Sequence, residues 1–411
     1  MKYQQHQLDN GLTILAESNP AAYSTAFGFF VRTGARDESK EIGGVSHFLE
    51  HMVFKGTPNR TADQVNLQLD EMGSASNART GEESTIYHSA VLPEFQTPMV
   101  ELLSDIMRPS LRDSDFETEK QVIIEEIMMY QDQPPYGGYE KSMELFFGSH
   151  GLGQSVLGTA ESVGNLTAEQ MKEYFKVRYS PSNIALAASG CVDFDQLVGD
   201  AESFCGQWDN FSANREKVTA NYHFGFENLH KPNSHQQYIL QLAPGPDCDD
   251  LRRFALRIGI SILGDEGGSR LYWKFLDSGL AESAGAGSYE YLDNGVIMNY
   301  VCCAPEQAQS NLKFLKDTQI EFQEKGVTER ELEMAKQKFA SQIVLASEKT
   351  ENRMFSMGSQ WLAGQEFKTV QEIAEIYQNV TLDEVNQAIK DFPLEKNMTL
   401  SIGPDESLQP V

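Results

Sequence analysis

The hydrophobic and polar positions near the N-terminus alternate as in short strands, and helical periodicity follows. Two strands are predicted at 6–16 around the turn Asp9-Asn10-Gly11, and a third, largely apolar strand at 24–33. Amphipathic helices with three- to four-residue spacing are predicted at 60–73, 93–107 and 113–130. A further pair of strands, joined through Gly81, is predicted at 74–92. This mixture of short strands and helices indicates an α+β fold.

The same order of elements occurs a second time after residue 235. A strand at 236–242 opens this second series, and a strand at 397–402 closes it. The segments Phe116 to Ile127 and Leu332 to Ile343 align without gaps in apolar spacing and in a shared Lys-Gln pair. We therefore predict two homologous domains related by internal duplication, each an antiparallel-rich mixed sheet packed with helices.

The segment Gly43 to Thr57 contains a candidate metal site. His47 and His51 are four residues apart, so on a helix both rings face the same side and can reach one ion. Glu50 leans toward that ion without pointing at it, which is the position of a general base. The order H-x-x-E-H is the inverse of the common zincin motif. The alternative is a chance match on an amphipathic helix whose histidines are solvated or packed.

A catalytic zinc ion usually takes three protein ligands, so a third ligand must come from elsewhere in the chain. The predicted helix at 113–130 offers several glutamates. Glu126 shares its face with apolar Ile123 and should point inward, whereas Glu125 should be more exposed. The pattern therefore favours Glu126 over Glu125. In the second copy Gln342 takes the place of Glu126 and the H-x-x-E-H motif is absent, so only the first copy can hold the metal.

The chain of 411 residues fits two domains of about 200 residues each. We predict an N-terminal zinc-binding catalytic domain at 1–210, a polar linker at 211–235 and a C-terminal homologous domain without a metal site at 236–411.

The excess of acidic residues limits the kinds of partner that the protein can bind. With 60 acidic and 33 basic residues the net charge is −27, which argues against nucleic acid or a membrane surface and favours basic peptides. Solubility alone is the other explanation of this charge. The 5 cysteines form no C-x-x-C motif, so neither a disulfide framework nor a thiolate zinc site is expected. No secretory signal or membrane-spanning run is visible, so we expect a cytoplasmic location.

These motifs together resemble the pitrilysin/insulinase family of zinc peptidases. The matching residues are H-F-L-E-H, the second glutamate of V-I-I-E-E-I, and N-A-R-T-G-E-E-S-T-I-Y at Asn77 to Tyr87. The chain is most similar to the shorter bacterial members related to mitochondrial processing peptidase, and the resemblance covers its whole length. It implies a zinc metalloendopeptidase that cleaves peptides or unfolded segments inside a dimeric chamber. A non-catalytic or partner-dependent subunit of a heterodimeric peptidase complex is the competing function.

The resemblance also implies roles for individual residues. It makes His47, His51 and Glu126 the zinc ligands and Glu50 the catalytic base. Glu119 matches an acidic residue that supports the site by orienting a ligand.

The resemblance assigns substrate binding to the strand Asn77, Ala78 and Arg79, whose backbone would pair with an extended peptide. Arg79 departs from the family, in which an aromatic residue is usual at this place. Phe275 and Glu282 stand where relatives carry an Arg and a Tyr that hold substrate. A homodimer would lack this pair. Either a paralogue supplies it in a heterodimer, or this protein anchors substrate differently.

Overall fold

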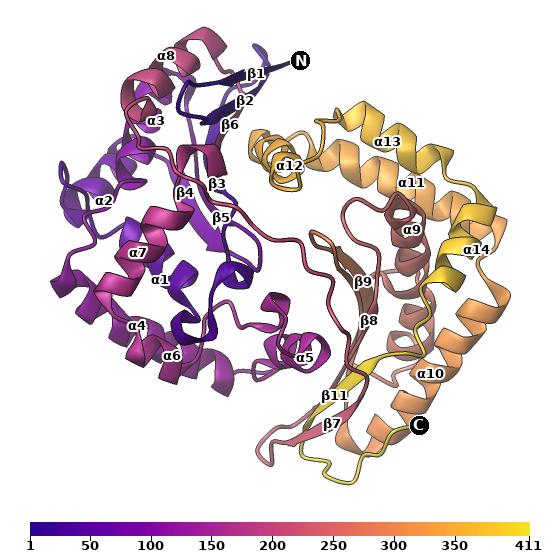
Figure 1. The fold of residues 1–411 in the computed structure, drawn as a ribbon. Coiled ribbons are helices and arrows are strands. Elements are labelled where there is room, and N and C mark those ends of the chain that lie inside the picture. The colour runs from indigo at the N-terminus through magenta and orange to yellow at the C-terminus, as the bar shows by residue number, and fades with distance from the viewer. The chain divides into compact units, whose positions relative to one another are not determined.

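The structure is a computed structural model that describes residues 1–411. It contains two compact units, each formed by a mixed, largely antiparallel sheet packed with helices (Figure 1), which confirms the predicted fold class. The first unit comprises Met1–Met129, Gln154–Glu216 and Ala346–Lys368. The second unit comprises Tyr130–Gly153, Lys217–Leu345 and Thr369–Val411.

The sheet of the first unit has the strand order β1-β2-β6-β3-β5-β4. Its strands are β1 (Lys2–Gln7), β2 (Thr13–Ser18), β3 (Thr25–Val31), β4 (Ala75–Thr80), β5 (Thr85–Val91) and β6 (Ile184–Gly190). Strands β2 and β6 run parallel, and all other neighbours are antiparallel. Strand β4 is therefore an edge strand with a strand partner on one side only.

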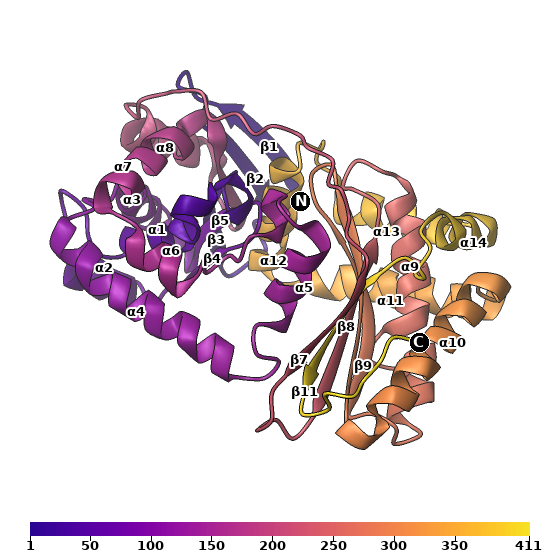
Figure 2. The ribbon, with the colours of Figure 1, turned by 60° about the horizontal axis from the view of Figure 1, so that its bottom comes forward.

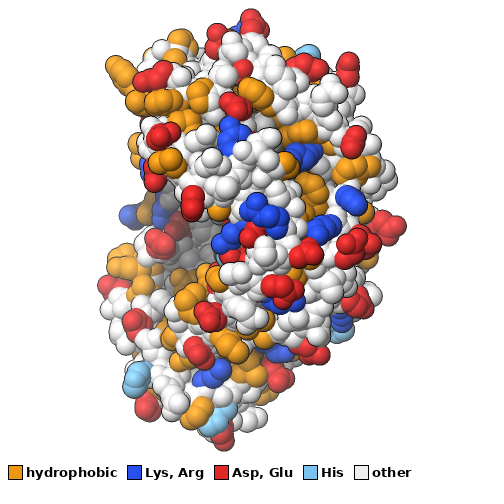
Figure 3. Space-filling model, turned by 90° about the vertical axis from the view of Figure 1, so that its left-hand side faces the viewer, with side chains coloured by type: hydrophobic (Ala, Val, Ile, Leu, Met, Phe, Trp, Pro, Cys, Tyr) orange, Lys and Arg blue, Asp and Glu red, His pale blue; other side chains and the backbone are white.

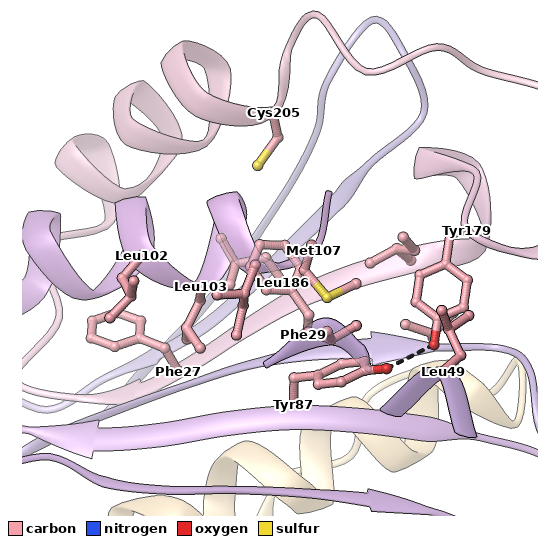
Figure 4. Packing of buried hydrophobic residues seen from close by; sticks show 14 of the residues in the cluster. Phe27, Phe29, Leu49, Tyr87, Leu102, Leu103, Met107, Tyr179, Leu186 and Cys205 are labelled. Carbon is pink, nitrogen blue, oxygen red and sulfur yellow. Dashed lines mark hydrogen bonds between the residues drawn. The ribbon is translucent and has the colours of Figure 1, made fainter. Parts of the chain in front are cut away.

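Helices cover both faces of this sheet. They are α1 (Val45–Val53), α2 (Ala62–Glu71), α3 (Gln96–Ile106), α4 (Asp113–Asp132), α6 (Ala160–Asn165), α7 (Ala168–Arg178), α8 (Phe194–Cys205) and α12 (Thr350–Leu362). On one face, side chains of β3 such as Phe27 and Phe29 pack with Leu102 and Leu103 of α3 (Figure 4). This core also positions α1 and α4, the two helices that carry the candidate metal ligands.

The buried phenol of Tyr87 on β5 hydrogen-bonds that of Tyr179 at 2.8 Å, as the dashed line in Figure 4 shows. Both side chains are fully buried, so this hydrogen bond satisfies two polar groups inside an apolar core.

The opposite face of the first sheet is covered by α12. Phe30 of β3 packs in one buried cluster with Met354 and Met357 of this helix. The guanidinium of Arg353 on α12 contacts both carboxylate oxygens of Glu17 on β2 at 3.0 Å. Helix α12 is thus anchored to the first unit by apolar packing and by a buried ion pair.

The second unit repeats the pattern with the strand order β7-β11-β8-β10-β9. Its strands are β7 (Gly225–His230), β8 (Gln237–Pro244), β9 (Ser283–Glu290), β10 (Gly295–Cys303) and β11 (Met398–Gly403). Its helices are α5 (Gly138–Phe147), α9 (Arg252–Gly264), α10 (Ala308–Lys325), α11 (Glu329–Ala346), α13 (Val370–Asn379) and α14 (Leu382–Asp391). Figure 2 shows α9, α10 and α14 along one side of this sheet, and α5 packs on β8 and β11 through the other face.

The strand pairings confirm the internal duplication. The parallel pair β7 and β11 corresponds to β2 and β6, and the antiparallel neighbours follow in the same order in both sheets. The aligned segments Phe116 to Ile127 and Leu332 to Ile343 lie in the corresponding long helices α4 and α11.

The compact units differ from simple N-terminal and C-terminal halves of the chain. Helix α5 belongs to the second unit although it lies within 1–210, and α12 belongs to the first although it lies within 236–411. In addition, residues Gly225–His230 of the predicted linker form strand β7, which pairs in parallel with β11. The pairing partner lies far along the chain, so local sequence does not reveal this strand.

Surface charge follows the composition. On the face in Figure 3, acidic side chains are spread widely, with Lys and Arg side chains between them. No helix combines the length and the apolar character needed to cross a membrane.

Candidate metal centre

Helix α1, which carries the H-x-x-E-H motif, is held at its N-terminus by Glu38. The N-cap residue of the helix is Gly44, which has a φ of 92° and no side chain to cap the helix. The buried carboxylate of Glu38 takes this role by accepting hydrogen bonds from the backbone N–H groups of Gly44 at 2.6 Å and Ser46 at 2.7 Å. A Cβ at position 44 would lie 2.6 Å from the carbonyl oxygen of Leu157, so this turn requires glycine.

The two histidines of the motif lie one turn apart with ring centroids 4.7 Å from each other. Burial, and secondarily the neighbouring His51, lowers the pKa of His47 to about 4. The ring of His47 is therefore neutral near pH 7, as a metal ligand must be. Its Nδ1 is buried without a hydrogen-bond partner.

Glu126 of α4 completes a group of three donors. Its Oε2 lies 3.7 Å from Nε2 of His47 and 3.6 Å from Nε2 of His51, and the ligand atoms of all three residues lie within 4.8 Å of one another. Ligands of a tetrahedral zinc ion, each about 2.0–2.1 Å from the metal, lie roughly 3.3 Å apart. The donor types and their spacing therefore fit zinc. Glu125 is exposed, so the structure brings Glu126 and not its neighbour to the histidines.

Glu119, almost two turns earlier on α4, fixes the orientation of His51. Its Oε1 is 2.8 Å from Nδ1 of His51, and its Oε2 is 2.5 Å from Nζ of Lys55. Burial raises the pKa of Glu119, but the hydrogen bonds from Lys55 and His51 outweigh burial and leave this pKa below its ordinary value. The ionised carboxylate accepts a hydrogen bond from Nδ1–H of His51. This leaves Nε2 of His51 as the ring nitrogen with a free lone pair, and it faces Glu126.

Glu50 lies beside the three donors and is held by β4. The hydroxyl of Thr80 donates a hydrogen bond of 2.6 Å to Oε2 of Glu50. Burial raises the pKa of Glu50, while the Thr80 hydrogen bond lowers it in part. The carboxylate thus has one oxygen anchored and the other, Oε1, available to accept a proton.

The sequence did not identify Thr80 or Lys55 as part of the site. Thr80 is the last residue of the N-A-R-T segment that matches the family, and only this match pointed to it. Lys55 follows the histidine helix without any pattern that marks its contact with Glu119.

The strand Asn77, Ala78 and Arg79 lies in β4 at the edge of the sheet. Asn77 accepts a hydrogen bond of 2.9 Å from the N–H of Ala78 through its side chain. Side chains alternate along a strand, so Arg79 lies on the opposite face from Thr80 and Glu50. Its guanidinium stacks over the ring of Phe355 on α12, 4.7 Å from the ring centroid. The structure therefore brings the predicted metal ligands, Glu50 and Glu119 together, whereas the Arg79 side chain lies away from them.

The two residues at the places of the family's Arg and Tyr differ in exposure. Phe275 is fully buried in the core of the second unit, and Glu282 is exposed. Phe275 therefore contributes to packing and presents no side chain to a substrate.

Two family models match the chain. Residues 13–160 match the model described as Insulinase (Peptidase family M16), and residues 165–339 match the model described as Peptidase M16 inactive domain. The first match contains the H-x-x-E-H motif and Glu126, and the second covers much of the metal-free copy.

Relatives and solved structures agree with this assignment. An uncharacterized zinc protease of Rickettsia felis is 32% identical over 410 residues, covering 97% of each chain. One of Bacillus subtilis is 29% identical over 407 residues, covering 98% of this chain and 99% of the relative. The crystal structure of a protease from Helicobacter pylori has a TM-score of 0.92 at 18% identity, covering 98% of this chain and 99% of that one. A Pseudomonas fluorescens structure titled peptidase M16 inactive domain also has a TM-score of 0.92 at 18% identity, with both chains covered completely. The chain therefore belongs to the insulinase family, peptidase family M16.

Proposed function

We propose that this protein is a zinc-dependent metalloendopeptidase that hydrolyses peptides or unfolded polypeptide segments. The observation that carries this proposal is the convergence of two imidazole nitrogens and one carboxylate oxygen within 4.8 Å, beside a second, anchored carboxylate. Such a donor set with an adjacent carboxylate is typical of zinc hydrolases. Further support comes from relatives that are named zinc proteases.

His47, His51 and Glu126 would hold the metal, and all three belong to the first unit. A bound zinc ion supplies a Lewis acid that polarises a carbonyl group and lowers the pKa of water. Oε1 of Glu50 accepts a proton from the attacking water while the oxygen of that water bonds to the scissile carbonyl carbon. Glu50 then returns the proton to the amine nitrogen as the C–N bond breaks. Thr80 holds Glu50 in place during both transfers.

The edge strand β4 would bind substrate through its backbone. Because β4 has a strand partner on one side only, an extended peptide can add to its free side and reach the metal centre by way of Thr80 and Glu50. Backbone pairing requires an extended substrate, so folded proteins are excluded. We propose that a second copy of the chain, or a paralogue, completes a chamber around this strand.

The metal and the base can be separated by two substitutions. Glu50→Gln should retain about one zinc per chain and lose hydrolysis by several orders of magnitude, whereas His47→Ala should lose both. Glu126→Gln should weaken zinc binding, and the matched control Glu125→Gln should leave it unchanged. The measurements are the zinc content per chain, by elemental mass spectrometry, and the cleavage of an unstructured peptide library. Full zinc and full activity in Glu126→Gln would contradict the ligand assignment.

A partner-dependent subunit is the second candidate function. The specific observation is that buried Phe275 and exposed Glu282 occupy the places of a substrate-holding Arg and Tyr. If a paralogue supplies that pair, the isolated chain should cleave peptides weakly and gain activity on mixing with the paralogue. Typical peptidase turnover by the isolated chain, with no gain on mixing, would refute this candidate.

A further inference from the structure

A cavity of about 550 Å³ lies on the sheet of the second unit and shares no residue with the metal centre. Its apolar wall consists of Tyr139, Tyr238, Leu240, Met298 and Tyr300. Residues 238 and 240 of β8 and residues 298 and 300 of β10 project from the same face of the sheet, because side chains alternate along a strand. The cavity therefore presents aromatic rings and aliphatic groups on one continuous surface.

Strand β9 leaves room for the ring of Tyr300, because the residue that pairs with Tyr300 is a glycine. Gly285 pairs with Tyr300 across the sheet, and a Cβ at position 285 would lie 2.6 Å from a ring carbon of Tyr300. The tyrosine ring thus occupies the place of the missing side chain and lies flat along the sheet.

One end of the cavity is polar and is organised by Gln236. Its Oε1 accepts hydrogen bonds from the hydroxyl of Tyr238 at 2.8 Å and the thiol of Cys302 at 3.1 Å. Its side-chain amide donates to the carboxylate of Glu282. This network orients Glu282 toward the cavity that it lines.

Glu282 supplies the only formal charge of the cavity wall. Burial and then the charge of Glu282 raise the pKa of Cys302 to about 11, so the thiol stays neutral. The side-chain partner of Glu282 is the neutral Gln236, and no lysine or arginine neutralises its carboxylate. An aromatic cavity with one unneutralised carboxylate at its end is complementary to a long side chain that ends in a cation.

We propose that this cavity binds the arginine side chain of a peptide, an inference that rests on the proposed peptidase function and names its substrate class. The aliphatic stem of arginine would pack on Leu240 and Met298, and its planar guanidinium would stack on the tyrosine rings. The same guanidinium donates paired hydrogen bonds to the carboxylate of Glu282. An apolar side chain would leave the negative charge of this carboxylate without a counter-charge, and an acidic one would be repelled. The net charge of −27 favours the approach of such cationic peptides.

The test compares two probes on protein that carries Glu50→Gln, so that no probe is hydrolysed. The probes are N-acetyl-arginine amide and N-acetyl-citrulline amide, which have the same shape and differ in the positive charge. Dissociation constants come from ligand-detected NMR titration. We expect the arginine probe to bind at least about fivefold tighter than the citrulline probe, which corresponds to roughly 1 kcal/mol.

Variants of the cavity locate this preference. Glu282→Gln should abolish the preference for arginine, because it removes the charge and retains the shape. Glu324→Gln replaces an exposed glutamate of α10 that does not line the cavity, and should leave the preference unchanged. Tyr300→Leu should weaken both probes, because both lose the ring on which their planar end groups stack.

Two results would overturn the proposal. Equal binding of arginine and citrulline probes by the parent protein would exclude recognition of the cation. A preference that survives Glu282→Gln would place the recognising carboxylate elsewhere. Because the assay requires neither zinc nor hydrolysis, failure of this proposal and failure of the proposed peptidase activity are observed separately.

Discussion

Replacing Glu119 by glutamine is expected to weaken zinc binding by about 10- to 100-fold without unfolding the protein. Glu119 accepts from Nδ1 of His51 at 2.8 Å and from Nζ of Lys55 at 2.5 Å. A glutamine has one acceptor oxygen and one amide nitrogen, so it can serve only one of these two donors.

The magnitude follows from the hydrogen bond that is lost. A hydrogen bond to a charged group contributes about 1.5–3 kcal/mol, which corresponds to roughly 10- to 150-fold in an equilibrium constant. The loss of this hydrogen bond affects zinc binding through His51, because its ring loses its fixed orientation and some of its basicity. Zinc affinity should therefore fall, while the circular dichroism of the metal-free protein stays the same.

The assay is competition for zinc against a chelator of known affinity at a fixed pH. Glu117→Gln is the matched control, since Glu117 lies on the same helix with a side chain that is 68% exposed. If Glu119→Gln binds zinc as tightly as the wild type and the control do, Glu119 does not orient a metal ligand and the geometric argument is wrong.

Three further predictions concern stability. Removal of zinc with a chelator should lower the Tm, because zinc at 100 times its Kd stabilises the folded state by about 2.7 kcal/mol; calorimetry showing no shift would argue against a resident metal. Phe48→Ala should lower the free energy of unfolding, measured with denaturant, by about 3–5 kcal/mol, because Phe48 is fully buried and its ring centroid lies 4.5 Å from that of Phe116. A decrease below about 1 kcal/mol would contradict this packing. Arg353→Ala should lower the free energy of unfolding by about 3–5 kcal/mol, because it leaves Glu17 buried without its ion-pair partner. The double variant with Glu17→Gln should recover part of this stability. If the effects of the two substitutions simply add, the ion pair does not contribute to stability.

The parts of the site that the sequence predicted are those set by helical periodicity. The spacing of His47 and His51 determines that both rings lie on one face of a helix of any globular protein. The inward orientation of Glu126 follows from the apolar Ile123 on the same face of α4, and in the structure Glu126 lies beside both histidines. The fold class and the duplication were predictable for the same reason, because the predicted strands and helices have local patterns of their own; strand β7 is an exception.

The parts that the sequence did not predict depend on contacts between distant segments. An amphipathic pattern shows that α5 and α12 each have an apolar face, but not which sheet that face covers. The Arg79 side chain lies over Phe355, more than 250 residues away in the chain, so the strand pattern could not show that it points away from the metal centre. The contact of Lys55 with Glu119 likewise arises only when α1 and α4 pack together.

The membership of α12 in the first unit has a consequence for the order in which the protein folds. During synthesis, the strands of the first sheet leave the ribosome long before α12 does, and Leu15, Phe30 and Ile86 then lack Met354 and Met357, which cover them in the finished protein. The nascent first unit therefore exposes an apolar sheet face until translation is nearly complete, and exposed faces of this kind promote aggregation. The first unit is completed only after Lys217–Leu345 of the second unit have been synthesised, so its apolar sheet face is open to aggregation for most of translation.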